Sequence, residues 1–259
     1  MIASWSTICS YPKTGRTWIR FMLAEYFSLS YDLNVDVNLL NVYTLIPNID
    51  TNVHGRGRDS IRAELRERQK VGMQHSWSDS RFMKSNDTVV LVRGFEDTLV
   101  SHWMHARFHY QAEGRSISEF IRSADTGLPQ IRLFAEYWAP RFDDPNVSFV
   151  SYEAMISRPL ETFEFLLAAL GVPVERQIAQ QAVEKSTFER MQRIEVEEGM
   201  LGIRYDRSNP EALRVRKGIV GGFREVLSPH DCTYIAAEVA KSEELKEISS
   251  LIAGQCRMS

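Results

Sequence analysis

The sequence predicts a single α/β domain over residues 1–259, with a central parallel β-sheet flanked by helices. A short apolar run, residues 5–10, leads through a glycine-containing turn directly into an amphipathic helical pattern. Residues 88–92 form a β-branched run without polar alternation, which is typical of a parallel strand buried on both faces. A chain of 259 residues is long enough for one such domain, and no repeat or linker divides it.

The elements are expected in the following order. The first strand and helix occupy about 4–29, a polar helix 60–70, the central strand 88–92, and helices 97–109, part of 114–127, and 130–138. A third strand at 147–152 precedes helices at 160–170, 178–185 and 187–194, a loop at 196–216, and a last helix at 229–242.

Composition narrows the class of protein. Hydrophobic residues make up 44% and the net charge is −3, which gives no reason to expect nucleic-acid binding. The three cysteines have no C-x-x-C spacing, which favours a reducing compartment. No apolar run reaches about 18 residues and no signal-peptide pattern opens the chain. We therefore expect a cytoplasmic protein that does not span or bind a membrane.

The turn at residues 11–18, YPKTGRTW, predicts an anion site. A strand, a tight turn and a helix start leave backbone N–H groups pointing outward, and the helix dipole favours negative charge there. Lys13 adds a cation, and Thr14 and Thr17 add hydroxyl donors. The turn is not a Walker A loop, because its lysine precedes the glycine.

YPKTGRTW resembles the 5′-phosphosulfate loop, Y-P-K-[SA]-G-[TN]-T-W, of cytosolic-type sulfotransferases. Those enzymes move a sulfuryl group from 3′-phosphoadenosine-5′-phosphosulfate (PAPS) to an acceptor. The resemblance implies a P-loop-kinase-like sulfotransferase fold, PAPS as cosubstrate and no required metal. The matching cofactor-binding residues are Lys13, Thr14, Gly15, Arg16, Thr17 and Trp18.

A second segment, residues 93–101, resembles the family's R-[ND]-P-x-D-x-x-x-S, in which the arginine and serine hold the 3′-phosphate. The matching residues are Arg93 and Ser101, with Gly94 and Phe95 in place of Asn-Pro. The residues alone also allow an ordinary ion pair between Arg93 and Asp97 at a helix start.

Three weaker segments complete the resemblance. Arg216, Lys217 and Gly218 resemble the start of R-K-G-x-x-G-D-W, which folds over the nucleotide, although Gly222 and Phe223 replace Asp-Trp. Tyr152, Ser186 and Phe188 resemble residues that border the adenine.

His75 is the predicted catalytic base, with Lys13 as the other catalytic residue. Met73-Gln74-His75 resembles the family's K-T-H segment, but Met73 replaces its lysine, so Lys13 acts alone or an arginine substitutes. His102, His105 and His109 share one helical face, which suits an acceptor pocket or, as an alternative, a metal.

The acceptor stays open between a small molecule and a glycoconjugate. Loop aromatics suit an apolar ring, and loop arginines suit a polar or anionic acceptor; the aromatics are Trp103, Phe108, Tyr110, Tyr137 and Trp138. The family's dimer motif is degraded after residue 218, so the oligomeric state is also open. The alternative functions are an ATP-dependent phosphotransferase of related fold and a non-catalytic nucleotide-binding module.

Overall fold

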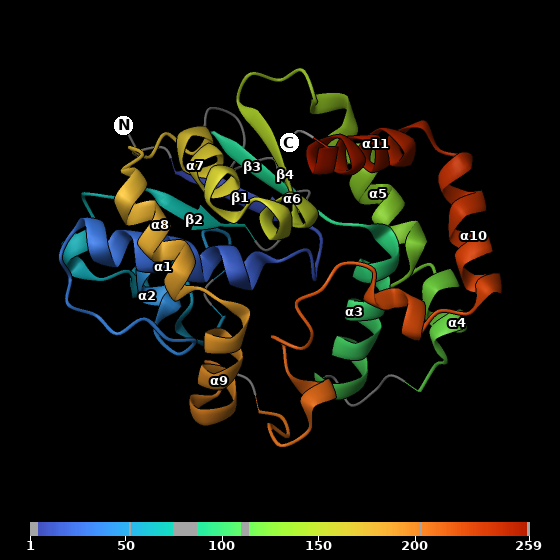
Figure 1. The fold of residues 1–259 in the computed structure, drawn as a ribbon, viewed down its shortest axis with the longest axis horizontal. Helices are drawn as coiled ribbons and strands as arrows, with labels where there is room; N and C mark the ends of the chain where they lie inside the picture. The colour runs from blue at the N-terminus through green and yellow to red at the C-terminus, as the bar shows by residue number, and fades with distance from the viewer. Residues whose placement is uncertain (1–4, 52, 75–86, 110–113, 203, 258–259) are drawn as a thin grey trace.

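A four-stranded parallel sheet organises the chain (Figure 1). The computed structural model describes residues 5–51, 53–74, 87–109, 114–202 and 204–257. The strands are β1 (Ser6–Ser10), β2 (Val71–Met73), β3 (Thr88–Val92) and β4 (Val147–Ser151), and their spatial order is β2-β1-β3-β4. Ile8 pairs with Met73 on one side and with Val89 on the other.

Alternate side chains of the sheet enter two different cores. Ile8, Val89 and Leu91 face the first core, and Cys9 and Val90 face the second. The first core is shared with α1 (Arg16–Ser30), α7 (Pro159–Ala169) and α8 (Arg176–Lys185). The second is shared with α3 (Phe95–His109), α5 (Leu128–Trp138) and α11 (Glu243–Arg257). Burial on both faces explains why β3 is a continuous apolar run.

The remaining helices extend these two layers. They are α2 (Val42–Leu45), α4 (Ile117–Arg122), α6 (Tyr152–Ser157), α9 (Phe188–Glu198) and α10 (Pro229–Ala240). In Figure 1, α1 and α8 lie toward the left and α3 and α10 toward the right. No helix among the described residues is long and apolar enough to cross a membrane.

The predicted helix at 60–70 is wrong. The chain instead makes two short 3₁₀ turns, Arg58–Ser60 and Ala63–Leu65. The N–H of Arg62 donates to the carbonyl of Thr44 at 2.9 Å, so a tertiary hydrogen bond takes the place of a helical one. Strand β2 and helix α11 were not predicted; β2 has only three residues, too few to show a period.

The predicted functional segments meet at the carboxyl ends of the strands. β1 leads into the turn at 11–18, β3 ends one residue before Arg93, and β4 ends one residue before Tyr152. Ligands of open α/β sheets bind at this edge, which makes it the place to look for a site.

Candidate active site

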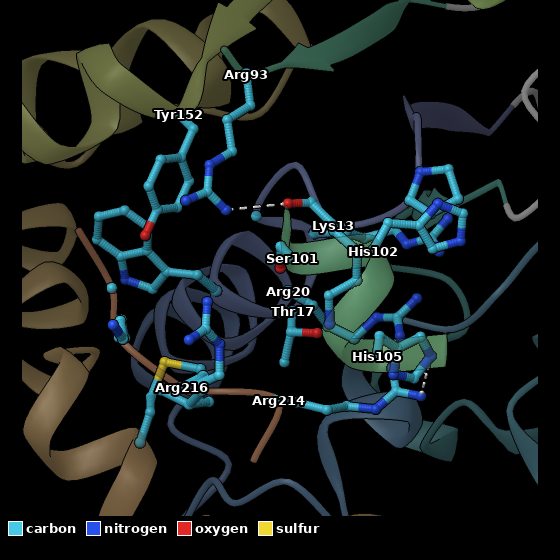
Figure 2. Close-up of a pocket in the computed structure, with 18 of the residues that line it drawn as sticks. Lys13, Thr17, Arg20, Arg93, Ser101, His102, His105, Tyr152, Arg214 and Arg216 are labelled. Atoms are coloured by element: carbon cyan, nitrogen blue, oxygen red, sulfur yellow. Dashed lines mark hydrogen bonds between the residues drawn. The ribbon is translucent and has the colours of Figure 1, made fainter. Parts of the chain in front are cut away.

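A cavity of about 630 Å³ opens at this edge of the sheet. It collects most of the residues predicted to bind the cofactor: Lys13, Gly15, Arg16, Thr17, Trp18, Arg93, Ser101, Tyr152, Phe188, Arg216, Lys217 and Gly218. Figure 2 shows Arg93 beside Tyr152 at one end and Arg214 beside His105 at the other, with Lys13 and Ser101 between them. Five separate segments of the sequence therefore contribute to one site.

The turn at 11–18 has the backbone conformation of an anion cradle. Gly15 has φ +103°, and a Cβ there would lie 2.8 Å from the Tyr152 ring, so only glycine fits without displacement. Lys13 also has a positive φ, 73°, which is rare for a residue with a side chain. The N–H groups of Trp18 and Ile19 both donate to the Gly15 carbonyl, which starts α1 at this point.

Arg93 joins the turn at 11–18 to residues 216–223, which we call the closing segment. Its guanidinium donates to the carbonyls of Lys13 and Ile219, each at 3.2 Å, and lies 4.2 Å from the Tyr152 ring centroid. Asp97 accepts from the N–H groups of Gly221 at 2.7 Å and Phe223 at 2.9 Å. Asp97 therefore links the closing segment to α3. Arg93 and Asp97, both of which the structure describes, do not form the ion pair that the residues alone also allowed.

Gly218 in the closing segment is a second position at which both the backbone conformation and close packing require glycine. Gly218 has φ +65°, and a Cβ there would lie 2.3 Å from the Phe188 ring. Arg216 forms an ion pair with Glu211 at 3.0 Å, and Lys217 pairs with Glu225. The two glycines thus each pack against an aromatic residue from a distant segment, which holds the cavity walls close together.

Thr14 and Ser186 do not line the cavity with their side chains. The Thr14 hydroxyl donates to the Tyr11 carbonyl at 2.9 Å, and the Ser186 hydroxyl donates to the Ala182 carbonyl at 2.7 Å. Trp18 donates its indole N–H to the Ser186 carbonyl at 2.8 Å. Both residues instead support neighbouring residues that do line the cavity.

His75, the predicted base, lies outside the described residues, and so does Tyr110. Its neighbour Gln74 is described, and the Arg16 guanidinium donates to the Gln74 carbonyl at 3.1 Å. Met73 is fully buried in the first core. An arginine therefore lies next to the segment in which Met73 replaces the family's lysine.

Burial and neighbouring cations change the charge state of Lys13. Desolvation, followed by the charges of Arg214 and Arg93, lowers the pKa of Lys13 to about 7, and Glu195 partly opposes this shift. The amine therefore loses its proton far more easily than an exposed lysine does until an anion enters. A phosphate or sulfate nearby favours its charged form.

His105 and His109 of α3 line the cavity in their neutral form. Burial, with the charges of Lys13 and Arg214, holds the pKa of His105 far below its usual range. Burial and the same two cations lower the pKa of His109 to about 4, and its Nε2 lies 2.8 Å from the Ala212 carbonyl. Arg214 donates to Nε2 of His105 at 3.4 Å. No group of three or more metal-ligating side chains occurs among the described residues.

Glu195, which was not among the predicted site residues, is fully buried. Its carboxylate accepts from the N–H groups of Arg214 and Val215, each at 2.7 Å, and from the Tyr205 hydroxyl. It therefore fixes the loop that places Arg214 and Arg216 in the cavity. A glutamate on the apolar face of α9, at i+4 from Met191, is the signal that could have found it.

A cationic cluster formed by Arg20, Tyr43 and Arg56 was not predicted either. The guanidinium carbons of Arg20 and Arg56 lie 4.1 and 4.7 Å from the centroid of the Tyr43 ring. Arg20 is 5% exposed and donates to Asn48 Oδ1 at 2.6 Å. Its sequence signal is an arginine inside an otherwise apolar helical stretch, residues 18–24.

Two of the loop aromatics lie in the core instead of the cavity. Trp138 is fully buried in the second core. Trp103 is 9% exposed and donates its indole N–H to the Arg115 carbonyl at 3.0 Å. Arginines, not these tryptophans, face the part of the cavity beyond the cofactor motifs.

Comparison with known proteins gives the same family. The sulfotransferase domain family matches residues 6–246. Cytosolic sulfotransferase 17 of Arabidopsis thaliana is 25% identical over 243 residues, covering 86% of this chain and 69% of the relative. Cytosolic sulfotransferase 16 of the same plant is 24% identical over 240 residues, covering 86% and 71%.

Solved structures share the fold. Mouse sulfotransferase SULT7A1 in complex with PAP superimposes with a TM-score of 0.64 at 18% identity, covering 96% of this chain and 89% of that one. Retinol dehydratase in complex with androsterone and the inactive cofactor PAP gives 0.62 at 19% identity, covering 93% and 80%. The predicted α/β fold of the sulfotransferases is confirmed.

The family match also confirms the predicted enzyme class, a PAPS-dependent sulfotransferase, over the kinase-like and non-catalytic alternatives. It covers nearly the whole chain, including every segment on which the resemblance was based. This chain belongs to the sulfotransferase domain family.

Proposed function

We propose that this protein transfers the sulfuryl group of PAPS, in line, to a hydroxyl or amine of its acceptor. Lys13 stabilises the charge that develops on the leaving oxygen, and His75 removes the acceptor proton. Such catalysis depends on positioning and on electrostatic stabilisation of the leaving group, with little covalent chemistry from the protein.

The observation that carries the proposal is the convergence of three cationic segments on one cavity: the turn at 11–18 with Lys13, residues 93–101, and residues 216–218. Arg93, Ser101 and Arg216 come from different elements and line it together. In the proposal they hold the 3′-phosphate, while the N–H groups of the turn at 11–18 hold the 5′-phosphosulfate. Tyr152 and Phe188 border the adenine, because each packs against a glycine of an anion-binding segment.

Thr14 and Ser186 take part indirectly in this proposal. Thr14 closes the turn through its bond to the Tyr11 carbonyl, and Ser186 anchors Trp18. Arg16, Thr17, Lys217 and Gly218 complete the cofactor side of the cavity. The proposed reaction uses no metal ion, because Lys13 and the arginines supply the positive charge.

Acceptor, domain organisation and location belong to the same proposal. Retinol dehydratase has been solved in complex with retinol and with androsterone, which are small lipophilic alcohols. For this chain we propose a small-molecule or glycoconjugate acceptor and a single domain over residues 1–259. We also propose a cytoplasmic location, by analogy with relatives named cytosolic sulfotransferases.

Calorimetry with the desulfated product PAP and with ADP tests the cofactor assignment. Loss of charge-assisted hydrogen bonds to the 3′-phosphate should weaken ADP relative to PAP by about ten- to a hundredfold. PAPS-dependent sulfation of a pooled acceptor library is the second measurement. Equal affinities for PAP and ADP would contradict the assignment of the 3′-phosphate site.

A further inference from the structure

The cavity carries more positive charge than the cofactor needs. Among the described residues nine lysine and arginine side chains line it, and two of them, Arg216 and Lys217, are paired with carboxylates outside the lining. The one carboxylate in the lining, Asp97, accepts from two backbone N–H groups. PAPS brings about four negative charges at neutral pH. The excess is concentrated in arginines that no cofactor motif includes: Arg20, Arg56, Arg204 and Arg214.

Arg20 and Arg56 form the centre of this excess. Both guanidinium groups lie over the Tyr43 ring, and none of the ion pairs within the described part of the chain includes either of them. Arg20 is only 5% exposed. Its Nε, and Nε and Nη2 of Arg56, are buried and donate to no acceptor among the described residues. Two cations held this way repel each other unless an anion joins them.

The cluster lies in the same cavity as Lys13, beside which the sulfuryl group leaves PAPS in the proposed reaction. Burial alone would raise the pKa of Tyr43, but the nearby guanidiniums of Arg20, Arg56 and Arg214 lower it overall. Arg214 also contributes to the lowered pKa of Lys13, so it lies within electrostatic range of both groups. Figure 2 shows Arg20 next to Thr17, beneath Lys13, and away from Arg93 and Tyr152.

The geometry points to an acceptor that carries an anionic group, a carboxylate or a phosphate or sulfate ester, held by Arg20 and Arg56. This inference rests on the proposed sulfotransferase function and adds the acceptor class. Planar guanidinium forks match the oxygens of these groups, and the Tyr43 ring keeps both forks in place. The anion would satisfy the buried donors while the acceptor hydroxyl lies toward Lys13.

A preference for anionic acceptors tests the inference. The protein saturated with PAP is titrated with inorganic phosphate and with acetate at constant ionic strength, and binding is followed by calorimetry and thermal unfolding. In parallel, PAPS-dependent transfer is measured for matched pairs, 4-hydroxybenzoate against 4-hydroxybenzamide and glucose 6-phosphate against glucose. We expect anion binding and a ten- to hundredfold higher kcat/KM for the charged member of each accepted pair. A stronger effect with phosphate than with carboxylate would identify a doubly charged group.

Arg56→Gln is the decisive variant, with Arg20→Gln as the second. Arg56 is partly exposed, so its replacement disturbs packing less than that of the buried Arg20. Each should bring the charged-to-neutral ratio of kcat/KM close to one and remove phosphate binding. Arg132→Gln, which breaks only a surface i,i+4 ion pair with Glu136, is the matched control and should keep the wild-type ratio.

The outcomes separate the two proposals. If PAP fails to bind, the proposed function is wrong and the acceptor inference falls with it. If PAP binds but neither anion does, and charged and neutral acceptors react equally, only the acceptor inference is overturned. It is also overturned if the preference survives in both Arg56→Gln and Arg20→Gln.

Discussion

The proposed cofactor side of the cavity, around Arg93 and Asp97, and the proposed acceptor side, around Arg20 and Arg56, hold their charged groups in different ways. On the cofactor side, charged side chains bind the backbone: Arg93 donates to two carbonyls, and Asp97 accepts from two N–H groups. On the acceptor side, Arg20 and Arg56 lie over the ring of Tyr43. Backbone-bound groups fix the shape of a loop, whereas ring-stacked cations leave donors available for a ligand.

This difference explains why only one side has a recognisable sequence pattern. Loop geometry requires a glycine wherever φ is positive and the chains pack closely, as at Gly15 and Gly218. Such requirements recur at fixed spacing. A cationic cluster from α1, α2 and the segment near residue 56 requires only that its side chains meet in space.

Replacement of His75 should give the largest effect. His75→Ala removes the proposed general base, so turnover should fall by about 10²- to 10⁴-fold while PAP binding is kept. Rates at saturating PAPS, with PAP affinity from calorimetry, provide the measurement. His230→Ala is the matched control, because His230 is exposed, pairs with Arg122 and does not line the cavity.

A parallel His109→Ala variant tests whether the base is a histidine of α3 instead of His75. His109 is neutral at pH 7 and lines the cavity, so it is the competing candidate. Near-normal turnover in His75→Ala together with loss of activity in His109→Ala would refute the assignment of His75.

Lys13→Ala should be next in size. Its amine is proposed to act on the leaving oxygen in the transition state, so kcat should fall by about 10²- to 10³-fold. PAP, which lacks the transferred group, should lose much less affinity. Lys246→Ala, which removes an exposed cation paired with Glu243, is the control. Equal losses in kcat and in PAP binding would mean that Lys13 only binds the nucleotide.

Gly218→Ala probes the packing of the cofactor side. A left-handed φ costs a residue with a Cβ about 1–2 kcal/mol, and here the Cβ would also lie 2.3 Å from Phe188. PAP affinity should therefore fall by roughly tenfold or more, measured by calorimetry. Gly254→Ala is the control, because nothing lies within 4 Å of its Cβ position in α11. The stability of Gly254→Ala should be unchanged or higher by about 0.5–1 kcal/mol. Unchanged PAP affinity in Gly218→Ala would argue against a role of the closing segment in PAP binding.

The smallest effect is a pH dependence of PAP binding. Free Lys13 has a pKa of about 7, and the bound anion raises it, so the complex holds more protons than the free protein above neutral pH. Binding is thus fully supported below pH 7 and weakens as pH rises through the pKa of the complex. Calorimetric affinities for PAP should therefore fall between pH 7 and 9, by up to about tenfold in total, because PAP depends little on Lys13. The slope should vanish in Lys13→Ala and persist in Lys246→Ala.

The sequence alone predicts three of the four strands, the turn at 11–18 and the order along the chain of the segments that line the cavity. Each is a local requirement, such as an apolar strand buried on both faces or a glycine at positive φ, and so it leaves a pattern along the chain. Strand β2 was not predicted because three residues are too few to show a period. The helix predicted at 60–70 does not form because tertiary hydrogen bonds replace helical ones there.

Which charged and aromatic side chains face the cavity depends on contacts between distant segments. Trp138 enters the core and Arg20 enters the cavity, although both stand in apolar helical stretches. Glu195 reaches Arg214 across 19 positions, and Arg56 reaches Tyr43 across a turn-rich segment. Burial and contact between distant residues set these positions, and no local pattern encodes a contact of that kind.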